Sequence, residues 1–243
     1  MTLLLLLFGA GLMAGALNVL AGGGSFLTLP ILIFAGLPPT VANGTNRVAI
    51  LLQNVTAVWG FDRRQLIDRR LAAQAIVPAL GGALIGTATA LVVGDLAFQR
   101  ILAVLMIVIV LWSLWGENPP AGERRLSRGG TVAAFFAVGL YGGFVQAGVG
   151  FLLLAVLTRL GLDLVRGNAL KVLVVLCFTP LSLGLFAWQG KVDWTLGLVL
   201  AAGNALGAWI GVHLTVWAGH RVLRVLVTAA ILVFAVVLFL QSG

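Results

Sequence analysis

Charged residues are scarce in this sequence. Asp, Glu, Lys and Arg make up 9% of its 243 residues, whereas roughly a quarter is usual in soluble globular domains. Hydrophobic residues make up 61%, and the mean hydropathy is +1.13. This composition excludes a soluble fold and predicts an all-α membrane protein. The net charge of +8 does not indicate a nucleic-acid partner, because the basic residues lie in short segments between apolar runs, where they orient membrane helices.

Acidic residues are absent from the interiors of the apolar runs. Each one lies in a loop or at the end of a run: Asp62, Asp68, Asp95, Glu117, Glu123, Asp163 and Asp193. No carboxylate at membrane depth is therefore available to bind a cation or relay protons, and we expect the substrate to be a small anion. The single cysteine, Cys177, excludes a disulfide framework and a thiolate metal site, and no cofactor or metal is expected.

Motifs of intramembrane enzymes are missing as well. The sequence has no H-E-x-x-H, no paired acids inside apolar runs, and no G-x-S-x-G around Ser25. Ser25 and His213 leave an intramembrane serine hydrolase as an alternative, but no carboxylate is available to orient the histidine. We expect that the protein is not an enzyme. A membrane scaffold that transports nothing is the other alternative.

The apolar runs divide the chain into two similar halves. They fall at residues 3–22, 26–36, 41–61, 71–93, 98–115, 131–149, 151–160, 165–188, 194–217 and 222–240. Each half has four long runs and one short run, and a helix needs about 20 residues to cross the hydrocarbon core. The short runs are predicted to be broken or re-entrant segments, because irregular backbone at membrane depth is tolerated only where protein or a cavity surrounds it.

An internal repeat relates the halves. An offset of 125 residues superposes identical residues: Phe26 on Phe151, Gly36 on Gly161, Asn43 on Asn168, Asp68 on Asp193, Gly82 on Gly207, Ala83 on Ala208, Ile85 on Ile210 and Gly86 on Gly211. Before the short runs the offset is 128, and it pairs Asn18 with Gln146. We predict a first transmembrane repeat at residues 1–115, a cytoplasmic linker at 116–130, and a second transmembrane repeat at 131–243.

The basic residues set the expected orientation. If the short runs cross the membrane, the second repeat is inverted. Arg100 and Lys191 then lie on one side, and the other side has eleven arginines: Arg63, Arg64, Arg69, Arg70, Arg124, Arg125, Arg128, Arg159, Arg166, Arg221 and Arg224. If the short runs turn back without crossing, the repeats are parallel and the asymmetry is weaker. The positive-inside rule favours inverted repeats in a multi-pass protein of the cytoplasmic (inner) membrane, with the linker in the cytoplasm and both termini outside.

Polar residues form matching stripes in two long runs. The first stripe comprises Asn43, Asn46, Arg47, Gln53 and Asn54, and the second comprises Asn168, Lys171 and Thr179. Arg47 and Lys171 are the only cations well inside apolar runs, and such charges usually face an interior path. The alternative is that each side chain extends to the nearby membrane interface.

Glycines stand at the start of both short runs. Gly22, Gly23, Gly24 and Ser25 precede 26–36, and Gly148 and Gly150 precede 151–160. Backbone N–H groups at a helix start attract anions, although a glycine run also serves as a hinge or a close-packing site. In the later runs, Gly82xxxGly86 and Gly203xxxGly207xxxGly211 predict close helix packing instead.

Several segments resemble the sulfite exporter TauE/SafE family of membrane permeases. In the first half these are GLMAGALNVLAGGGSFLTLPIL (11–32) and GLPPTVANGTN (36–46), and in the second half GLYGGFVQAGVGFLLLAVL (139–157), RGNALK (166–171) and KVDW (191–194). The resemblance covers most of the chain and implies a permease or exporter for sulfite, organosulfonates or related small anions. The second half has Ala169, Leu170 and Lys171 where the first has GTN at 44–46, so the site it implies is not symmetric.

These patterns and the resemblance together predict one substrate site between the repeats. Its residues are Gly22, Gly23, Gly24, Ser25, Asn43, Thr45, Asn46, Arg47, Gln146, Gly148, Gly150, Asn168 and Lys171. The expected partners are the anion and the lipid bilayer. The sequence does not determine the exact anion, the direction of transport, the energy coupling or the oligomeric state.

Overall fold

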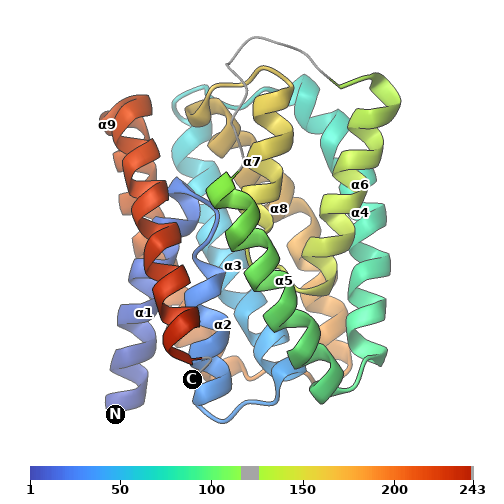
Figure 1. Cartoon of the computed structure of the whole chain (residues 1–243), viewed down its shortest axis with the longest axis vertical. Coiled ribbons are helices and arrows are strands. Elements are labelled where there is room, and N and C mark those ends of the chain that lie inside the picture. Colours follow the sequence, from blue (N-terminus) through green and yellow to red (C-terminus); the bar gives the residue numbers. More distant parts are fainter. Residues whose placement is uncertain (116–125, 242–243) are drawn as a thin grey trace.

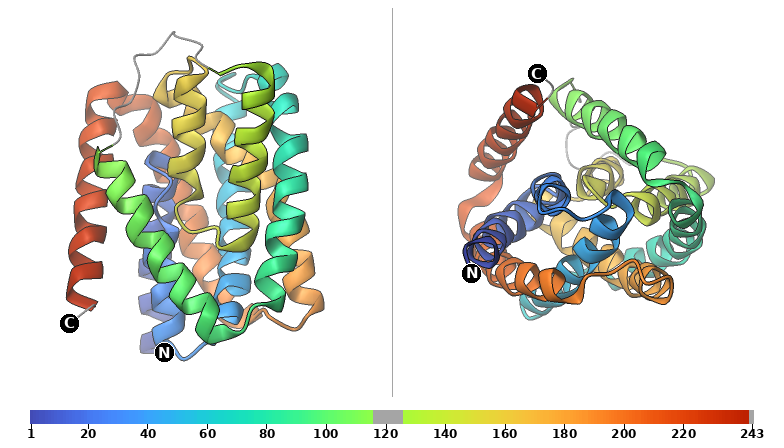
Figure 2. Two further views of the ribbon diagram at one scale, coloured as in Figure 1. Left: turned by 45° about the vertical axis from the view of Figure 1, so that its right-hand side comes forward. Right: turned by 90° about the horizontal axis from the view of Figure 1, so that it is seen from below.

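The computed structural model describes residues 1–115 and 126–241, and these residues form helices and turns without strands (Figure 1). The helices are α1 (Thr2–Leu20), α2 (Ser25–Phe34), α3 (Pro39–Asp62), α4 (Arg69–Val92), α5 (Asp95–Trp115), α6 (Arg128–Phe144), α7 (Val149–Arg159), α8 (Leu164–Trp188) and α9 (Trp194–Gln241). The all-α prediction is confirmed, and most helices follow the predicted runs closely. The difference is α9, which covers the last two runs and whose later part turns back toward the end of the molecule where Met1 lies (Figure 2).

Four helices in the described part of the chain are long and apolar enough to cross a membrane. They are α1, α4, α8 and the Trp194–Trp217 part of α9. α3 has the same length as α4, 24 residues, but its polar stripe keeps it out of this group. Because the stripe is buried inside the bundle, α3 does not have to present it to lipid. The chain is a multi-pass membrane protein.

Short polar side chains set several helix starts. Asp68 and Asp163 each accept two backbone N–H bonds at the starts of α4 and α8, and Ser127 accepts one at the start of α6. Such caps satisfy N–H groups that have no partner within the helix. As a result α6 begins at Arg128, inside the predicted linker, and residues 116–125 of that linker lie outside the described residues.

Small residues allow two pairs of helices to touch along their backbones. On α4, a Cβ added to Gly82 or Gly86 would overlap the carbonyl oxygens of Phe136 or Leu140 on α6. On α9, Gly203 and Gly207 approach α1 in the same way. The α1–α9 and α4–α6 pairs are the most extensive helix contacts in the fold. The packing role predicted for these glycine patterns is confirmed.

The short helices α2 and α7 form hairpins with the helices that precede them. α1 begins, and α2 ends, at the end of the molecule that holds Met1 (the Met1 end), whereas α6 begins and α7 ends at the opposite end, which holds Asp68 (the Asp68 end; Figures 1 and 2). The tips of the two hairpins meet inside the bundle, where Gly22 touches the backbone of Gly150. α3 and α8 pack against each other beside these tips, which brings their polar stripes to the break points of both hairpins.

Candidate functional site

The polar stripes of α3 and α8 are enclosed by protein. Asn43, Asn46, Arg47 and Asn168 have no exposed surface, and Lys171 is 2% exposed. A side chain that extended to the membrane interface would keep its charged end accessible. The interface alternative is therefore wrong for both cations, because their charged groups are bonded inside the bundle.

Arg47 holds the end of α6. Its Nη2 donates to the carbonyls of Gly142 (3.2 Å) and Gly143 (2.5 Å), and its Nη1 donates to Oε1 of Gln146 (2.7 Å). The guanidinium also lies 4.8 Å from the centre of the Phe186 ring. A helix that ends inside the protein leaves carbonyls without partners and carries partial negative charge, so a cation at this position stabilises it.

Lys171 holds the end of α1 in the same manner. Its Nζ donates to the carbonyls of Asn18 (2.8 Å) and Val19 (3.0 Å) and to Oδ1 of Asn168 (2.6 Å). The three protons of an ammonium group all have acceptors in this arrangement.

The paired asparagines complete the same pattern. Asn168 donates its Nδ2 to the carbonyl of Leu20 (3.1 Å), near the end of α1, and Asn43 donates to the carbonyl of Phe144 (2.8 Å), the last residue of α6. The stripe on α3 thus binds the end of α6, and the stripe on α8 binds the end of α1, so each stripe holds a helix of the other half. The matching of Asn43 with Asn168 in the sequence corresponds to matching contacts in space.

The two buried cations have no buried carboxylate as counter-charge among the described residues. The aspartates whose side chains are described are exposed or half-buried, and Asp68 and Asp163 cap helices at the Asp68 end. Backbone carbonyls compensate part of the charge. Because a desolvated charge is costly unless it is paired, the centre of the bundle is a favourable place for an anion.

A narrow cavity of about 10 Å³ lies beside Lys171. It is lined by Asn18, Ser25, Ile50, Gln53, Asn54, Gln146, Val149, Gly150, Lys171, Val172 and Val175. Of the predicted site residues, Ser25, Gln146, Gly150 and Lys171 therefore meet at one cavity. A single water molecule needs about 10–15 Å³, so an anion of several heavy atoms does not fit the cavity in this conformation.

Several buried polar atoms of the α3 stripe have no hydrogen-bond partner in the described structure. They are Oδ1 of Asn43, Nδ2 of Asn46 and Nε of Arg47. Asn46 uses only its Oδ1, which accepts from the Thr28 hydroxyl (2.7 Å) on α2. An unsatisfied buried group costs about 1–3 kcal/mol, so these atoms favour a ligand or a second conformation that would pair them.

The remaining predicted residues are divided between the hairpin tips and the Met1 end. Gly22, Gly23 and Gly24 are buried at the α1–α2 tip, and Gly148, at φ +74°, forms the N-terminal cap position of α7. Thr45 does not reach the cavity, because its hydroxyl accepts from the backbone N–H of Asp193 (2.9 Å) in the turn before α9.

Sequence reasoning missed a small amide network on the cavity wall. Oε1 of Gln53 accepts from Nδ2 of Asn18 and from Nδ2 of Asn204, both at 3.1 Å. Asn204 is fully buried, and its Oδ1 has no partner in the described structure. An asparagine in the middle of the apolar run 194–217 was the available signal, since amides are costly in lipid.

Comparison with known proteins gives a consistent result. The family described as "Sulfite exporter TauE/SafE" matches residues 7–238. The chain is 30% identical over 233 residues to a probable membrane transporter protein of Haemophilus influenzae, covering 93% of this chain and 90% of that protein. It is 32% identical over 248 residues to the probable membrane transporter protein YfcA of Escherichia coli K12, covering 99% and 91%. No solved structure gives a significant match.

Proposed function

The chain belongs to the sulfite exporter TauE/SafE family of membrane transporters, and we propose that it moves a small anion, sulfite or an organosulfonate, across the cytoplasmic membrane. The route passes through the cavity beside Lys171, where two inverted repeats meet. The observation that carries this proposal is a buried ammonium group on the wall of a central cavity, with no buried carboxylate to neutralise it among the described residues.

Electrostatics supports an anion rather than a cation. Two unit charges 4 Å apart interact by about 4 kcal/mol at an effective dielectric constant of 20. An anion in the cavity would gain energy of this order from Lys171, and Arg47 would add to it through Gln146, which lines the cavity and accepts from Arg47. A cation would meet repulsion from both groups.

The repeat is supported by equivalent contacts in the two halves, and its inversion is supported by the directions of the two hairpins. In the repeat, α1 corresponds to α6 and α4 corresponds to the first part of α9, and the extensive pairs α1–α9 and α4–α6 are equivalent under this correspondence. The two hairpins also enter the bundle from opposite ends (Figure 1). Inverted repeats with interrupted helices at a shared site allow the halves to exchange conformations, which is a common basis of alternating access.

Transport requires a second conformation. The cavity is too small for the proposed anion, so the tips that meet at Gly22 and Gly150 have to separate before substrate enters. Such a movement would also give the unpaired atoms of Asn43, Asn46 and Arg47 access to the substrate.

The alternatives are weaker. In a scaffold that transports nothing, Arg47 and Lys171 would only hold the helix ends, and the polar lining of the cavity beside Lys171 would have no role. A serine hydrolase is disfavoured because Ser25 lines the cavity, whereas His213 is exposed and its Nδ1 contacts the Trp209 carbonyl of its own helix (2.8 Å).

Flux measurements on a matched pair of variants test the proposal. Asn54 lines the cavity and Thr56 does not, yet each side chain has one hydrogen bond, to the carbonyl four residues earlier. In proteoliposomes that contain purified protein, we expect saturable sulfite flux, reduced about tenfold or more in Asn54→Val, since a hydrogen bond to a charged group contributes about 1.5–3 kcal/mol. Thr56→Val should keep the wild-type flux. Equal flux in both variants, or no flux of sulfite or any organosulfonate, would refute the proposal.

A further inference from the structure

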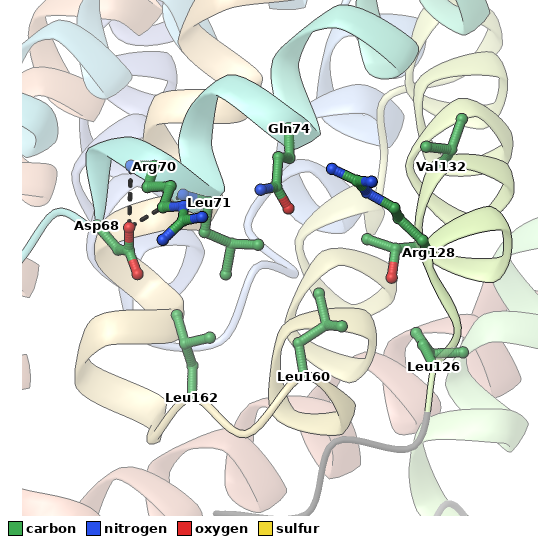
Figure 3. Close-up of a pocket in the computed structure, with 10 residues that line it drawn as sticks. Asp68, Arg70, Leu71, Gln74, Leu126, Arg128, Val132, Leu160 and Leu162 are labelled. Carbon is green, nitrogen blue, oxygen red and sulfur yellow. Dashed lines mark hydrogen bonds between the residues drawn. The ribbon is translucent and has the colours of Figure 1, made fainter.

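A second and larger cavity lies between α4 and α6 at the Asp68 end. Its volume is about 690 Å³, and it shares no residue with the central cavity. Its polar side chains include Arg70, Gln74 and Arg128, and Figure 3 shows Gln74 and Arg128 extending toward each other. This cavity is far larger than an inorganic anion needs and lies within the range of sites for ligands of 300–1,000 Å³.

The two arginines of this cavity have no ion-pair partner among the described residues. The described salt bridges join other arginines, Arg69 with Asp62 and Arg166 with Asp163. Asp68 also lines the cavity, but its carboxylate accepts the backbone N–H groups of Arg70 and Leu71, as the dashed lines in Figure 3 mark. The cavity therefore presents two guanidinium groups without an ion-pair partner beside one capped carboxylate, and the net charge of its lining is positive.

Part of the cavity wall is apolar and continues along α6 to the outside of the bundle. Leu126 and Leu160 line it together with Val132, which is 50% exposed and lies one helical turn beyond Arg128 on α6. Along α6 a guanidinium is thus followed by an exposed apolar side chain in the direction of the membrane interior. A phospholipid has the same order, a charged phosphate followed by an acyl chain.

We propose that this cavity binds an anionic phospholipid, with its phosphate at Arg70 and Arg128 and an acyl chain against Val132. Basic pockets between membrane helices at the cytoplasmic side are typical sites for anionic headgroups. A soluble anion would use the arginines but would leave the apolar wall exposed. The site is independent of the transport proposed above, because it is tested by lipid binding alone.

Native mass spectrometry of the detergent-purified protein, titrated with phosphatidylglycerol or phosphatidylcholine, tests the site. We expect tighter binding of phosphatidylglycerol, and a loss of about 30-fold in Arg70→Gln/Arg128→Gln, since each arginine near an anionic surface contributes about a factor of five. Arg63→Gln/Arg69→Gln removes the same charge at the same end from residues that do not line the cavity, and should bind phosphatidylglycerol normally.

Two further measurements complete the test. Gln74→Glu adds a negative charge inside the cavity and should weaken phosphatidylglycerol binding with both arginines in place. Inorganic phosphate at the same concentration should not displace the lipid. Displacement by phosphate would assign the cavity to a soluble anion, and equal binding of both lipids or equal loss in the two double variants would also overturn the proposal.

Discussion

The buried cations combine a structural role with the proposed electrostatic one. Arg47 and Lys171 each satisfy carbonyls at the end of an interrupted helix that belongs to the other half. Lys171 also lines the central cavity, whereas Arg47 reaches it only through Gln146. A change at either residue will therefore affect stability and flux together, and the two effects have to be measured separately.

Charge should matter more than size at both positions. We expect Lys171→Met and Arg47→Gln to weaken sulfite binding about tenfold or more, because an anion stripped of water must meet opposite charge. Arg47→Lys should keep part of the activity, since it keeps the charge but loses the planar fork of donors. Binding and flux in proteoliposomes, together with the thermal unfolding temperature, measure both effects.

The asparagines supply the comparison for these cations. Asn43→Ala and Asn168→Ala remove uncharged bonds to the same helix ends, and we expect reduced flux in both. If Lys171→Met, Arg47→Gln and both alanine variants transport sulfite normally, the anion site is wrong, and only the family membership supports transport.

Sequence reasoning could identify the polar stripes but not their partners. A polar stripe on an apolar helix predicts burial, and this prediction is confirmed for Asn43, Arg47 and Lys171. The acceptors are backbone carbonyls about 95 to 153 residues away along the chain, and every residue has a carbonyl, so no residue type marks them. For the same reason Thr45 could not be distinguished from its neighbours as a contact of the turn before α9.

At the scale of helices, the sequence set most boundaries because the apolar runs end at Asp, Pro and Gly. The link expected between returning short runs and parallel repeats is wrong. α2 turns back beside α1, so the whole hairpin returns to the end where it began, and a returning short helix does not make the repeats parallel. The contact of Gly22 with Gly150 depends on both hairpins reaching the same depth, which is a property of the assembled bundle.

Glycine packing between α4 and α6 yields a test of stability. Gly86→Ala would push a methyl group into the Leu140 carbonyl and should destabilise the protein by about 1–3 kcal/mol. Gly184→Ala is the matched control on α8, where a Cβ meets nothing within 4 Å, and should stabilise by up to about 1 kcal/mol through helix propensity. In detergent, the unfolding temperature should fall in Gly86→Ala and should stay the same or rise in Gly184→Ala. A Gly86→Ala variant as stable as the wild type would contradict the close packing.

At the scale of the whole molecule, the basic residues separate between the two ends. The turn after α3 and the starts of α4, α6 and α8 lie at the Asp68 end and carry arginines, among them Arg63, Arg70, Arg128 and Arg166. Lys191 lies in the turn between α8 and α9, at the Met1 end. Since cytoplasmic loops are enriched in Lys and Arg, this asymmetry favours a cytoplasmic Asp68 end.

Reporter fusions test this orientation and the inversion together. A fluorescent protein inserted in the 116–130 linker should fluoresce, because the linker joins α5 to α6 on the arginine-rich side. Alkaline phosphatase fused after Gly243 should be active, because it needs the disulfides that form outside the cytoplasm and the later part of α9 returns toward the Met1 end (Figure 2). Exchanging the two reporters is the control and should silence both. With parallel repeats the linker and the C-terminus would lie on the same side, so a fluorescent, phosphatase-inactive C-terminus would refute the inverted arrangement and the alternating access inferred from it.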